Sequence, residues 1–150
     1  MNIVLYQPEI PHNTGAIGRT CLLTNSALHL IHPLGFFLDE KNLKRSGLDY
    51  WKRLKVHEYD SFKDFLFKSH ATNIFLIETS GKIKYTDMSY SKDCFLVFGS
   101  ETAGLPKNIL DTYQKNTVHI PMVKGERSIN LSVAVGIVLY EALRQTGFCI

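Results

Sequence analysis

The stretch that decides the fold is Phe98-Gly99-Ser100-Glu101-Thr102-Ala103-Gly104-Leu105-Pro106, which closes the apolar run at residues 94–98. A buried strand here ends at a glycine, turns through a carboxylate and a second glycine, and enters a helix at a proline, which suits a first helical position. Open α/β sheets bind their ligands in loops of this kind. The backbone N–H groups could cradle a ligand. No Gly-Lys-Ser/Thr follows, so the loop is not a P-loop.

Apolar strand patterns and helical patterns alternate on both sides of this loop. Several strands are nearly continuous apolar runs, which is typical of a parallel sheet covered by helices on both faces. The pattern predicts one α/β domain over residues 1–150 with a mostly parallel six-stranded sheet. The expected strands are 3–6, 28–32, 54–59, 73–78, 94–98 and 117–120, and the expected helices are 14–24, 39–44, 61–68, 106–114 and 130–145.

Length and composition fit a single soluble domain. The 150 residues are 45% hydrophobic and 21% charged, which excludes a disordered chain and a fibrous repeat. The length leaves no room for an appended RNA-binding domain. Three cysteines without CxxC spacing and scattered histidines indicate neither a disulfide framework nor a metal site, and predict a reducing, cytoplasmic compartment. Residues 20–38 are free of charge, but their polar residues together with Pro33 and Gly35 exclude a membrane helix.

The net charge of +3 is weakly basic, which permits a nucleic-acid partner without arguing for one. The basic residues are concentrated at 41–55, a segment that contains six lysines and arginines, one acidic residue and two aromatic residues. Cations beside aromatic rings suit phosphate contact and base stacking, and a solvated basic face is the alternative. The candidate RNA contacts are Lys41, Lys44, Arg45, Lys52 and Arg53, together with Arg127 from a later loop.

Two further polar loops each follow an expected strand and lead into an expected helix. In each loop a short polar side chain can cap the helix that follows. Taken alone, the first loop is better explained as a plain loop-to-helix turn. In the second loop, capping explains only one of Ser128 and Asn130, yet both occur in the same turn as Arg127. The polar residues concerned are Asn13, Thr14 and Arg19 in the first loop and Arg127, Ser128 and Asn130 in the second.

The last expected helix has no charge between residues 131 and 140, and apolar residues occupy every face. A surface helix shows a polar stripe, so this helix is predicted to be buried nearly all round. Ser132 and Gly136 would form a flat strip for close backbone approach. Burial within one chain would explain the pattern, but in so small a protein we favour a homo-oligomer.

Three segments, in order along the chain, form a recognisable set: Asn13-x-Gly15-x3-Arg19, FGSETAGLP at 98–106, and IPM at 120–122 followed by RSINLSVAV at 127–135. The set resembles the three motifs of the SPOUT superfamily of trefoil-knotted RNA methyltransferases, and is most similar to its 2′-O-methylating SpoU branch. GLDYW at 47–51 and YEALRQ at 140–145 resemble the TrmL (YibK) subfamily, which methylates the ribose of the tRNA wobble nucleotide. Ser100 and Ile129 depart from the motifs without changing their polar groups.

The resemblance implies a C-terminal trefoil knot and S-adenosyl-L-methionine as the cofactor. It also implies a homodimer in the cytoplasm that acts on the tRNA anticodon stem-loop, with no metal and no membrane. The reaction would transfer a methyl group to the ribose 2′-hydroxyl of a wobble cytidine or uridine. The cofactor-binding residues that it implies are Ile77, Gly99, Ile120 and Ser128, with Leu105 and Met122 as apolar neighbours.

The resemblance also suggests catalytic roles. Arg19 matches the arginine to which the family assigns activation of the 2′-hydroxyl. Because a guanidinium stays protonated in proteins, we expect Arg19 to hold the adjacent phosphate and stabilise a developing alkoxide. Glu101 would orient Arg19 or accept the proton. The side chains expected to position the ribose or shape the loop are Asn13, Ser128 and Asn130.

Besides an unrelated nucleotide-binding α/β protein, two alternatives remain open from the sequence. The first is a SpoU-type methyltransferase acting on another tRNA position or on ribosomal RNA. The second is a non-catalytic RNA-binding module that retains the fold.

Overall fold

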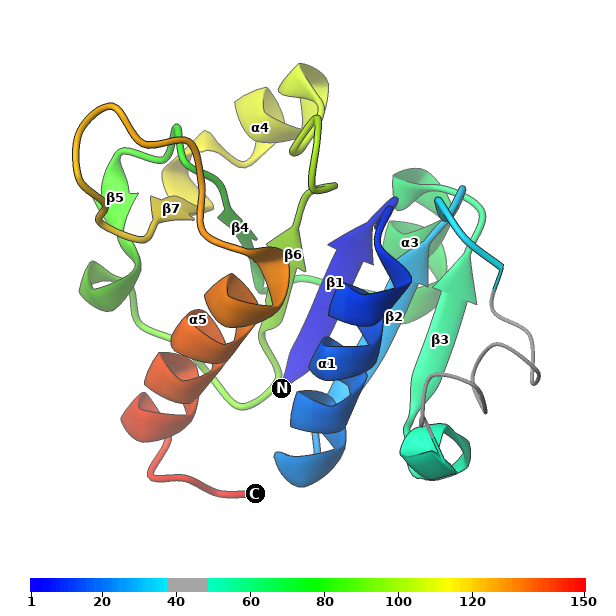
Figure 1. The fold of residues 1–150 in the computed structure, drawn as a ribbon. Coiled ribbons are helices and arrows are strands. Elements are labelled where there is room, and N and C mark those ends of the chain that lie inside the picture. Colours follow the sequence, from blue (N-terminus) through cyan, green and yellow to red (C-terminus); the bar gives the residue numbers. More distant parts are fainter. Residues whose placement is uncertain (38–48) are drawn as a thin grey trace.

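The computed structural model describes residues 1–37 and 49–150 (Figure 1). Its centre is a seven-stranded sheet with the order β3-β2-β1-β6-β4-β7-β5, in which every pairing is parallel. The predicted α/β fold with a parallel sheet is confirmed. The strands are β1 (Asn2–Tyr6), β2 (Ala27–Ile31), β3 (Val56–Tyr59), β4 (Ile74–Ile77), β5 (Ile83–Lys84), β6 (Phe95–Phe98) and β7 (Thr117–His119).

The strand that the sequence pattern missed is β5. It is two residues long and pairs at the sheet edge with β7. A two-residue strand has no periodicity that a sequence pattern could show, so only its pairing with β7 identifies it as part of the sheet. The sheet therefore has one strand more than expected.

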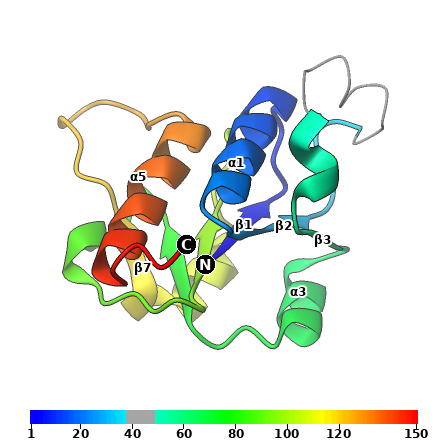
Figure 2. The same cartoon turned by 90° about the horizontal axis from the view of Figure 1, so that it is seen from below.

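Helices cover both faces of the sheet. In the described part of the chain, α1 and α5 pack side by side over one face, whereas α3 and α4 cover the other (Figure 2). The helix predicted at residues 39–44 lies outside the described residues. The helices are α1 (Pro11–Leu23), α3 (Phe62–Ser69), α4 (Lys107–Thr112) and α5 (Leu131–Gln145), with 3₁₀ turns η1 (Asp49–Arg53), η2 (Tyr85–Asp87) and η3 (Gln114–Asn116).

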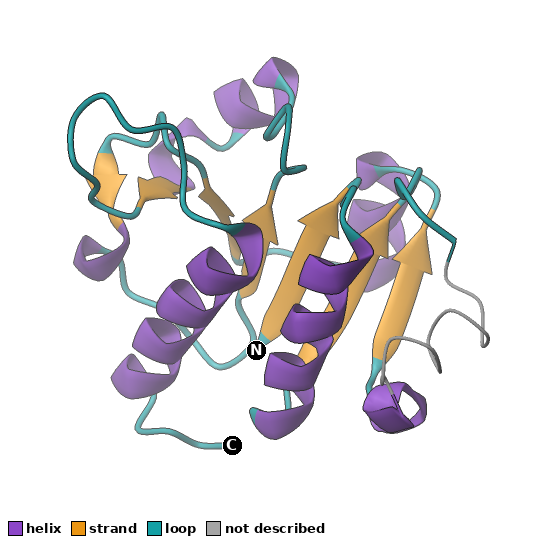
Figure 3. Cartoon of the chain, in the orientation of Figure 1, coloured by secondary structure: helices purple, strands orange, loops and turns teal. Residues whose placement is uncertain are grey.

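Successive residues of the central strands face opposite layers. In β1, Ile3 and Leu5 pack in the layer of α1 and α5, whereas Val4 packs with Phe65 of α3. Because both layers are apolar, these strands read in the sequence as continuous apolar runs. Because the pairings are parallel, the carboxyl ends of β1, β6 and β4 meet at one edge of the sheet (Figure 3).

Within one chain, α5 is buried along one face only. Val135, Val138 and Leu139 are fully covered, but Val133 and Tyr140 are 52% and 49% exposed. Burial nearly all round within one chain, the alternative to a homo-oligomer, is therefore wrong, because the sheet and α1 cover only one side of this helix. Its other side presents apolar side chains at the surface.

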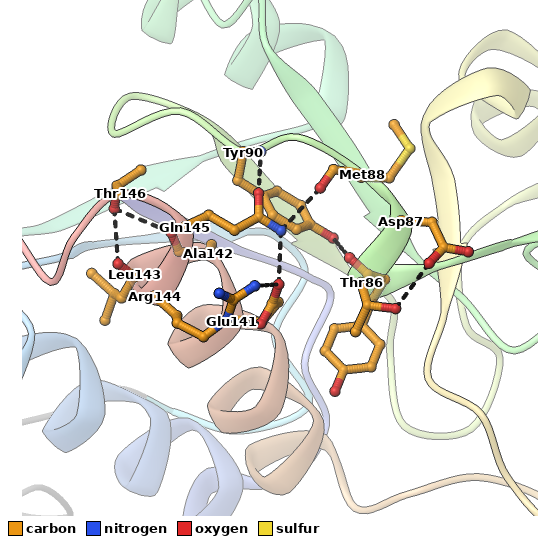
Figure 4. A network of polar contacts seen from close by, with 11 residues as sticks. Thr86, Asp87, Met88, Tyr90, Glu141, Ala142, Leu143, Arg144, Gln145 and Thr146 are labelled. Atoms are coloured by element: carbon orange, nitrogen blue, oxygen red, sulfur yellow. Dashed lines mark hydrogen bonds and ion pairs between the residues drawn. The ribbon is translucent and has the colours of Figure 1, made fainter.

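The carboxyl end of α5 is fastened to the segment between β5 and β6 (Figure 4). Gln145 Oε1 accepts a hydrogen bond from the backbone N of Tyr90 at 3.0 Å, and its Nε2 donates to the backbone O of Met88 at 3.0 Å. Its Nε2 also donates to Glu141, which forms an ion pair with Arg144, both contacts being 2.8 Å long. One amide side chain thus holds the helix against the loop that precedes β6.

His29 of β2 is buried among aromatic rings in the layer of α3. Its Nδ1 lies 2.9 Å from the hydroxyl of Tyr59, its Nε2 lies 3.3 Å from Oδ1 of Asn2, and its ring stacks on His57. Burial, and to a smaller extent the charge of His57, lowers the pKa of His29 from 6.5 to about 4. His29 is therefore neutral in the folded protein at neutral pH.

We expect the protein to lose stability as the pH falls from 6.5 towards 4. In this range the unfolded chain protonates His29 and the folded chain does not, so the free energy of unfolding decreases with falling pH. The loss between pH 7 and pH 5 should be about 2 kcal/mol. Urea unfolding of the wild type and of His29→Gln at both pH values measures it, with the exposed His12→Gln as the control. Equal losses in the wild type and His29→Gln would contradict this assignment.

Candidate active site

The loops that follow β4, β6 and β7 surround a cavity of about 610 Å³ at the carboxyl edge of the sheet. This volume is in the range of small-molecule sites. Five of the six residues predicted to bind the cofactor line it, and the sixth, Leu105, is buried beside it. The five are Ile77, Gly99, Ile120, Met122 and Ser128.

Two glycines let the loop after β6 fold back on itself. Ser100 and Gly104 exchange backbone hydrogen bonds, with N–O distances of 3.0 and 3.3 Å. A Cβ on Gly99 would collide with the backbone of Gly104, so a side chain does not fit there. Gly104 itself has a φ of +68°, where glycine carries no steric penalty. The two glycines of the sequence motif are therefore needed for the turn that forms one wall of the cavity.

Glu101 of this loop organises the start of α1. Its carboxylate accepts hydrogen bonds from the backbone N of Glu9 at 2.8 Å and of Ile10 at 3.2 Å, and from Nδ2 of Asn13 at 2.9 Å. The helix begins at Pro11, three residues before the expected start. Asn13, a candidate cap, is therefore inside the helix and donates to Glu101. A carboxylate at this end of a helix is also stabilised by the helix dipole.

Asn130 connects the third motif to the other two. Its Nδ2 donates to Oδ1 of Asn13 at 3.0 Å, and its Oδ1 accepts from the backbone N of Ser132 at 2.9 Å. Of the two candidate caps of the last helix, the structure uses Asn130 and not Ser128. Glu101, Asn13 and Asn130 thus form one hydrogen-bonded line that joins the three motifs.

Arg19 lies apart from this line. It is six residues beyond Asn13, which corresponds to about 9 Å along α1. Its side chain is exposed, and the guanidinium lies over the ring of Tyr50, 5.1 Å from the ring centroid. The donors to Glu101 come from the start of α1, so the expectation that Glu101 orients Arg19 is not met by this geometry.

The predicted RNA contacts fall in three places. Arg127 is exposed and lines the cavity, next to Ser128. Lys52 and Arg53 are exposed in the last turn of η1, which packs against α1 near Arg19. The remaining three, Lys41, Lys44 and Arg45, lie outside the described residues.

Glu78 lines the cavity, and sequence reasoning missed it. Its Oε1 accepts from the backbone N and the hydroxyl of Thr79 at 2.8 and 3.1 Å, and its Oε2 accepts from the backbone N of Leu105 at 3.2 Å. Glu78 therefore joins the loop after β4 to the loop after β6. A carboxylate directly after a buried strand is the signal that could have revealed it.

Among residues 1–37 and 49–150, no group of three or more histidine, cysteine or carboxylate side chains is placed to hold a metal ion. In the same part of the chain, no helix has both the length and the apolar character needed to cross a membrane.

Residues 1–140 match the family model described as the SpoU rRNA methylase family. The chain belongs to the SpoU methylase family. The tRNA (cytidine(34)-2′-O)-methyltransferase of Escherichia coli (strain K12) is 45% identical over 149 residues, covering 99% of this chain and 95% of that protein. The enzyme of the same name from Yersinia pestis is 45% identical over 154 residues, with the same shares covered.

Solved structures of SpoU methyltransferases have the same fold. A structure described as giving insights into the 2-OH methylation of C/U34 on tRNA matches with a TM-score of 0.89 and 42% identity, covering 97% of this chain and 95% of that one. The SpoU methyltransferase AviRb from Streptomyces viridochromogenes, in complex with AdoMet, matches with a TM-score of 0.80 and 27% identity, covering 97% and 60%. The resemblance predicted from the three motifs is confirmed, and the trefoil knot stays a prediction from it.

We expect Glu78→Ala to weaken the binding of S-adenosylmethionine about tenfold or more. The variant leaves the backbone N–H of Leu105 without its acceptor, and a hydrogen bond to a charged group contributes about 1.5–3 kcal/mol. Isothermal titration calorimetry measures the Kd. Asp111→Asn, which removes an exposed carboxylate of α4, is the matched control and should bind as the wild type does. An unchanged Kd in Glu78→Ala would show that this contact does not shape the pocket.

Proposed function

We propose that this SpoU methylase transfers a methyl group from S-adenosyl-L-methionine to the ribose 2′-hydroxyl of a cytidine or uridine at the tRNA wobble position. The observation that carries the proposal is the meeting of three motifs, far apart in the sequence, beside one cavity. Glu101, Asn13 and Asn130 are hydrogen bonded there. The names of relatives that are 45% identical over nearly the whole chain support the substrate and the position.

The residues of the cavity fit this cofactor. Ile77 and Ile120 offer apolar surface for an adenine, and Gly99 leaves the backbone accessible for hydrogen bonds. Two of the residues that line the cavity, Glu78 and Glu101, are acidic, and their negative charge suits a sulfonium cation and disfavours a triphosphate. When bound, the cofactor supplies an already activated methyl group, so the chain itself needs to place the ribose and remove one proton.

The side chains that we assign to the reaction lie in two places, at the cavity and beside the basic turn η1. The hydrogen bond between Asn130 and Asn13 holds the starts of α5 and α1 together beside the cavity. We assign Ser128, which lines the cavity, to contact with the ribose. Arg127 lines the same cavity and offers a cation to the RNA backbone. Arg19, outside the cavity of its own chain, is placed beside the basic turn η1, and we assign it to the phosphate next to the target ribose.

Nucleoside mapping tests the proposal directly. Total tRNA from a strain lacking the enzyme, incubated with this protein and S-adenosylmethionine, should gain a ribose methyl group at the wobble nucleotide. A methyl group elsewhere in tRNA or in ribosomal RNA would favour another SpoU specificity. A protein that binds no cofactor at millimolar concentration would instead be an RNA-binding module.

We also propose that the protein is a cytoplasmic homodimer that binds the tRNA anticodon stem-loop. Exposed apolar side chains in the layer of α1 and α5 support the dimer. They are Leu23 on α1, Val133 and Tyr140 on α5, and Phe148 after α5, which are 68%, 52%, 49% and 51% exposed. Exposed apolar surface of this kind marks interfaces between proteins. A second copy would also double the basic surface available to a tRNA.

We expect Tyr140→Glu to convert the dimer to a monomer at micromolar concentration, because it would bury a charge without a partner in the interface. Sedimentation velocity measures the mass. Phe67→Glu changes an aromatic residue that is 78% exposed on α3, in the opposite layer, and should remain dimeric. A dimeric Tyr140→Glu would place the interface elsewhere.

A further inference from the structure

Tyr50 connects the basic turn η1 to α1 at two points. Its hydroxyl donates a hydrogen bond to the backbone O of Gly15, and its ring lies beneath the guanidinium of Arg19 at 5.1 Å. Tyr50 is only 4% exposed, whereas Arg19 is exposed. A buried ring whose far end is anchored to a helix carbonyl is a rigid support for a long, mobile side chain. The face of a tyrosine ring also attracts a cation.

Trp51, the next residue, sets how closely η1 approaches α1. A Cβ on Gly18 would lie 2.9 Å from Cζ3 of Trp51 and 3.1 Å from Cδ2 of Leu54. The absence of a side chain at Gly18 therefore allows the indole to pack directly on the helix. This packing fixes the place of η1 along α1, and with it the place of the Tyr50 ring opposite Arg19.

The charges around this contact indicate which kind of ligand Arg19 binds. Among the described residues, Arg19 makes no ion pair with a carboxylate, so its charge is available to a ligand. Lys52 and Arg53 follow Tyr50 in the same turn and are exposed. Three cations therefore lie on two packed elements, the arrangement that a phosphate backbone recognises. The ring determines which orientation Arg19 presents to that backbone.

We propose that Tyr50 is a positioning residue for the methyl transfer. It holds the Arg19 guanidinium in the orientation that binds the phosphate beside the target ribose, and so couples RNA contact at η1 to the placement of the ribose. This inference rests on the proposed function, because it assigns a support to an arginine that the proposed reaction uses. Glu101 and Asn13 shape the cofactor side of α1, and Tyr50 shapes its RNA side.

A double-mutant cycle tests the coupling. Methyl transfer to tRNA at saturating cofactor is measured for the wild type, Tyr50→Leu, Arg19→Ala and the double variant. We expect kcat/KM to fall about tenfold in Arg19→Ala and about threefold to fivefold in Tyr50→Leu. The double variant should match Arg19→Ala alone, because Tyr50 acts through Arg19. Tyr50→Phe keeps the ring and should recover most of the loss seen in Tyr50→Leu.

Controls separate this role from a structural one. Tyr113→Leu removes a half-buried tyrosine ring in the opposite layer and should keep the wild-type kcat/KM. The calorimetric Kd for S-adenosylmethionine should be unchanged in Tyr50→Leu and Arg19→Ala, since neither residue lines the cavity in the described structure.

Three outcomes would overturn the proposal. The first is that Tyr50→Leu has the wild-type kcat/KM for methyl transfer to tRNA. The second is that Tyr50→Leu lowers kcat/KM by the same factor whether residue 19 is arginine or alanine. The third applies if Tyr50→Leu does not fold, in which case Tyr50→Phe is the test. A fall of kcat/KM in Tyr50→Phe as large as that in Arg19→Ala would exclude the ring as the support of Arg19. By contrast, a wild-type protein that methylates no tRNA refutes the proposed function itself.

Discussion

The carboxylate of Glu101 is the interaction on which the site depends. It accepts hydrogen bonds from two backbone N–H groups just before α1 and from the side chain of Asn13, which lie 88 to 92 residues away in the sequence. Those N–H groups have no partner inside the helix and need an acceptor from outside. Through Asn13 the same carboxylate reaches Asn130 and the start of α5. Two helices and the loop after β6 are therefore held at one point.

This arrangement explains why the cavity lies at the carboxyl edge of the sheet. The parallel order brings the ends of β4, β6 and β7 together, and the loop after β6 can turn back only because Gly99 and Gly104 lack side chains. Glu78 then ties the loop after β4 to that turn. A pocket built from loops of several strands needs such cross-links, because each loop by itself is free to move.

The helix α1 makes two separate sets of contacts along its length. Its first turn is bound to Glu101 and Asn130 beside the cavity, and its middle packs against η1 with Arg19 over Tyr50. Under the proposed function, cofactor recognition belongs to the first turn of α1 and RNA recognition to its middle. The apolar sides of α1 and α5 that remain exposed leave room for a second copy beside the same element.

The sequence by itself determined the α/β class, six of the seven strands and the four helices of the described chain, the motif glycines, and Asn130 as one of two candidate caps, because these depend on local periodicity and local backbone geometry. It also indicated the family, since three motifs occur in one order. Only the tertiary structure decided that Asn13 lies inside α1, that Glu101 binds the helix start and not Arg19, that Glu78 joins two loops, and that α5 is covered on one side. Each of these depends on contacts between residues far apart in the chain, which no local pattern records.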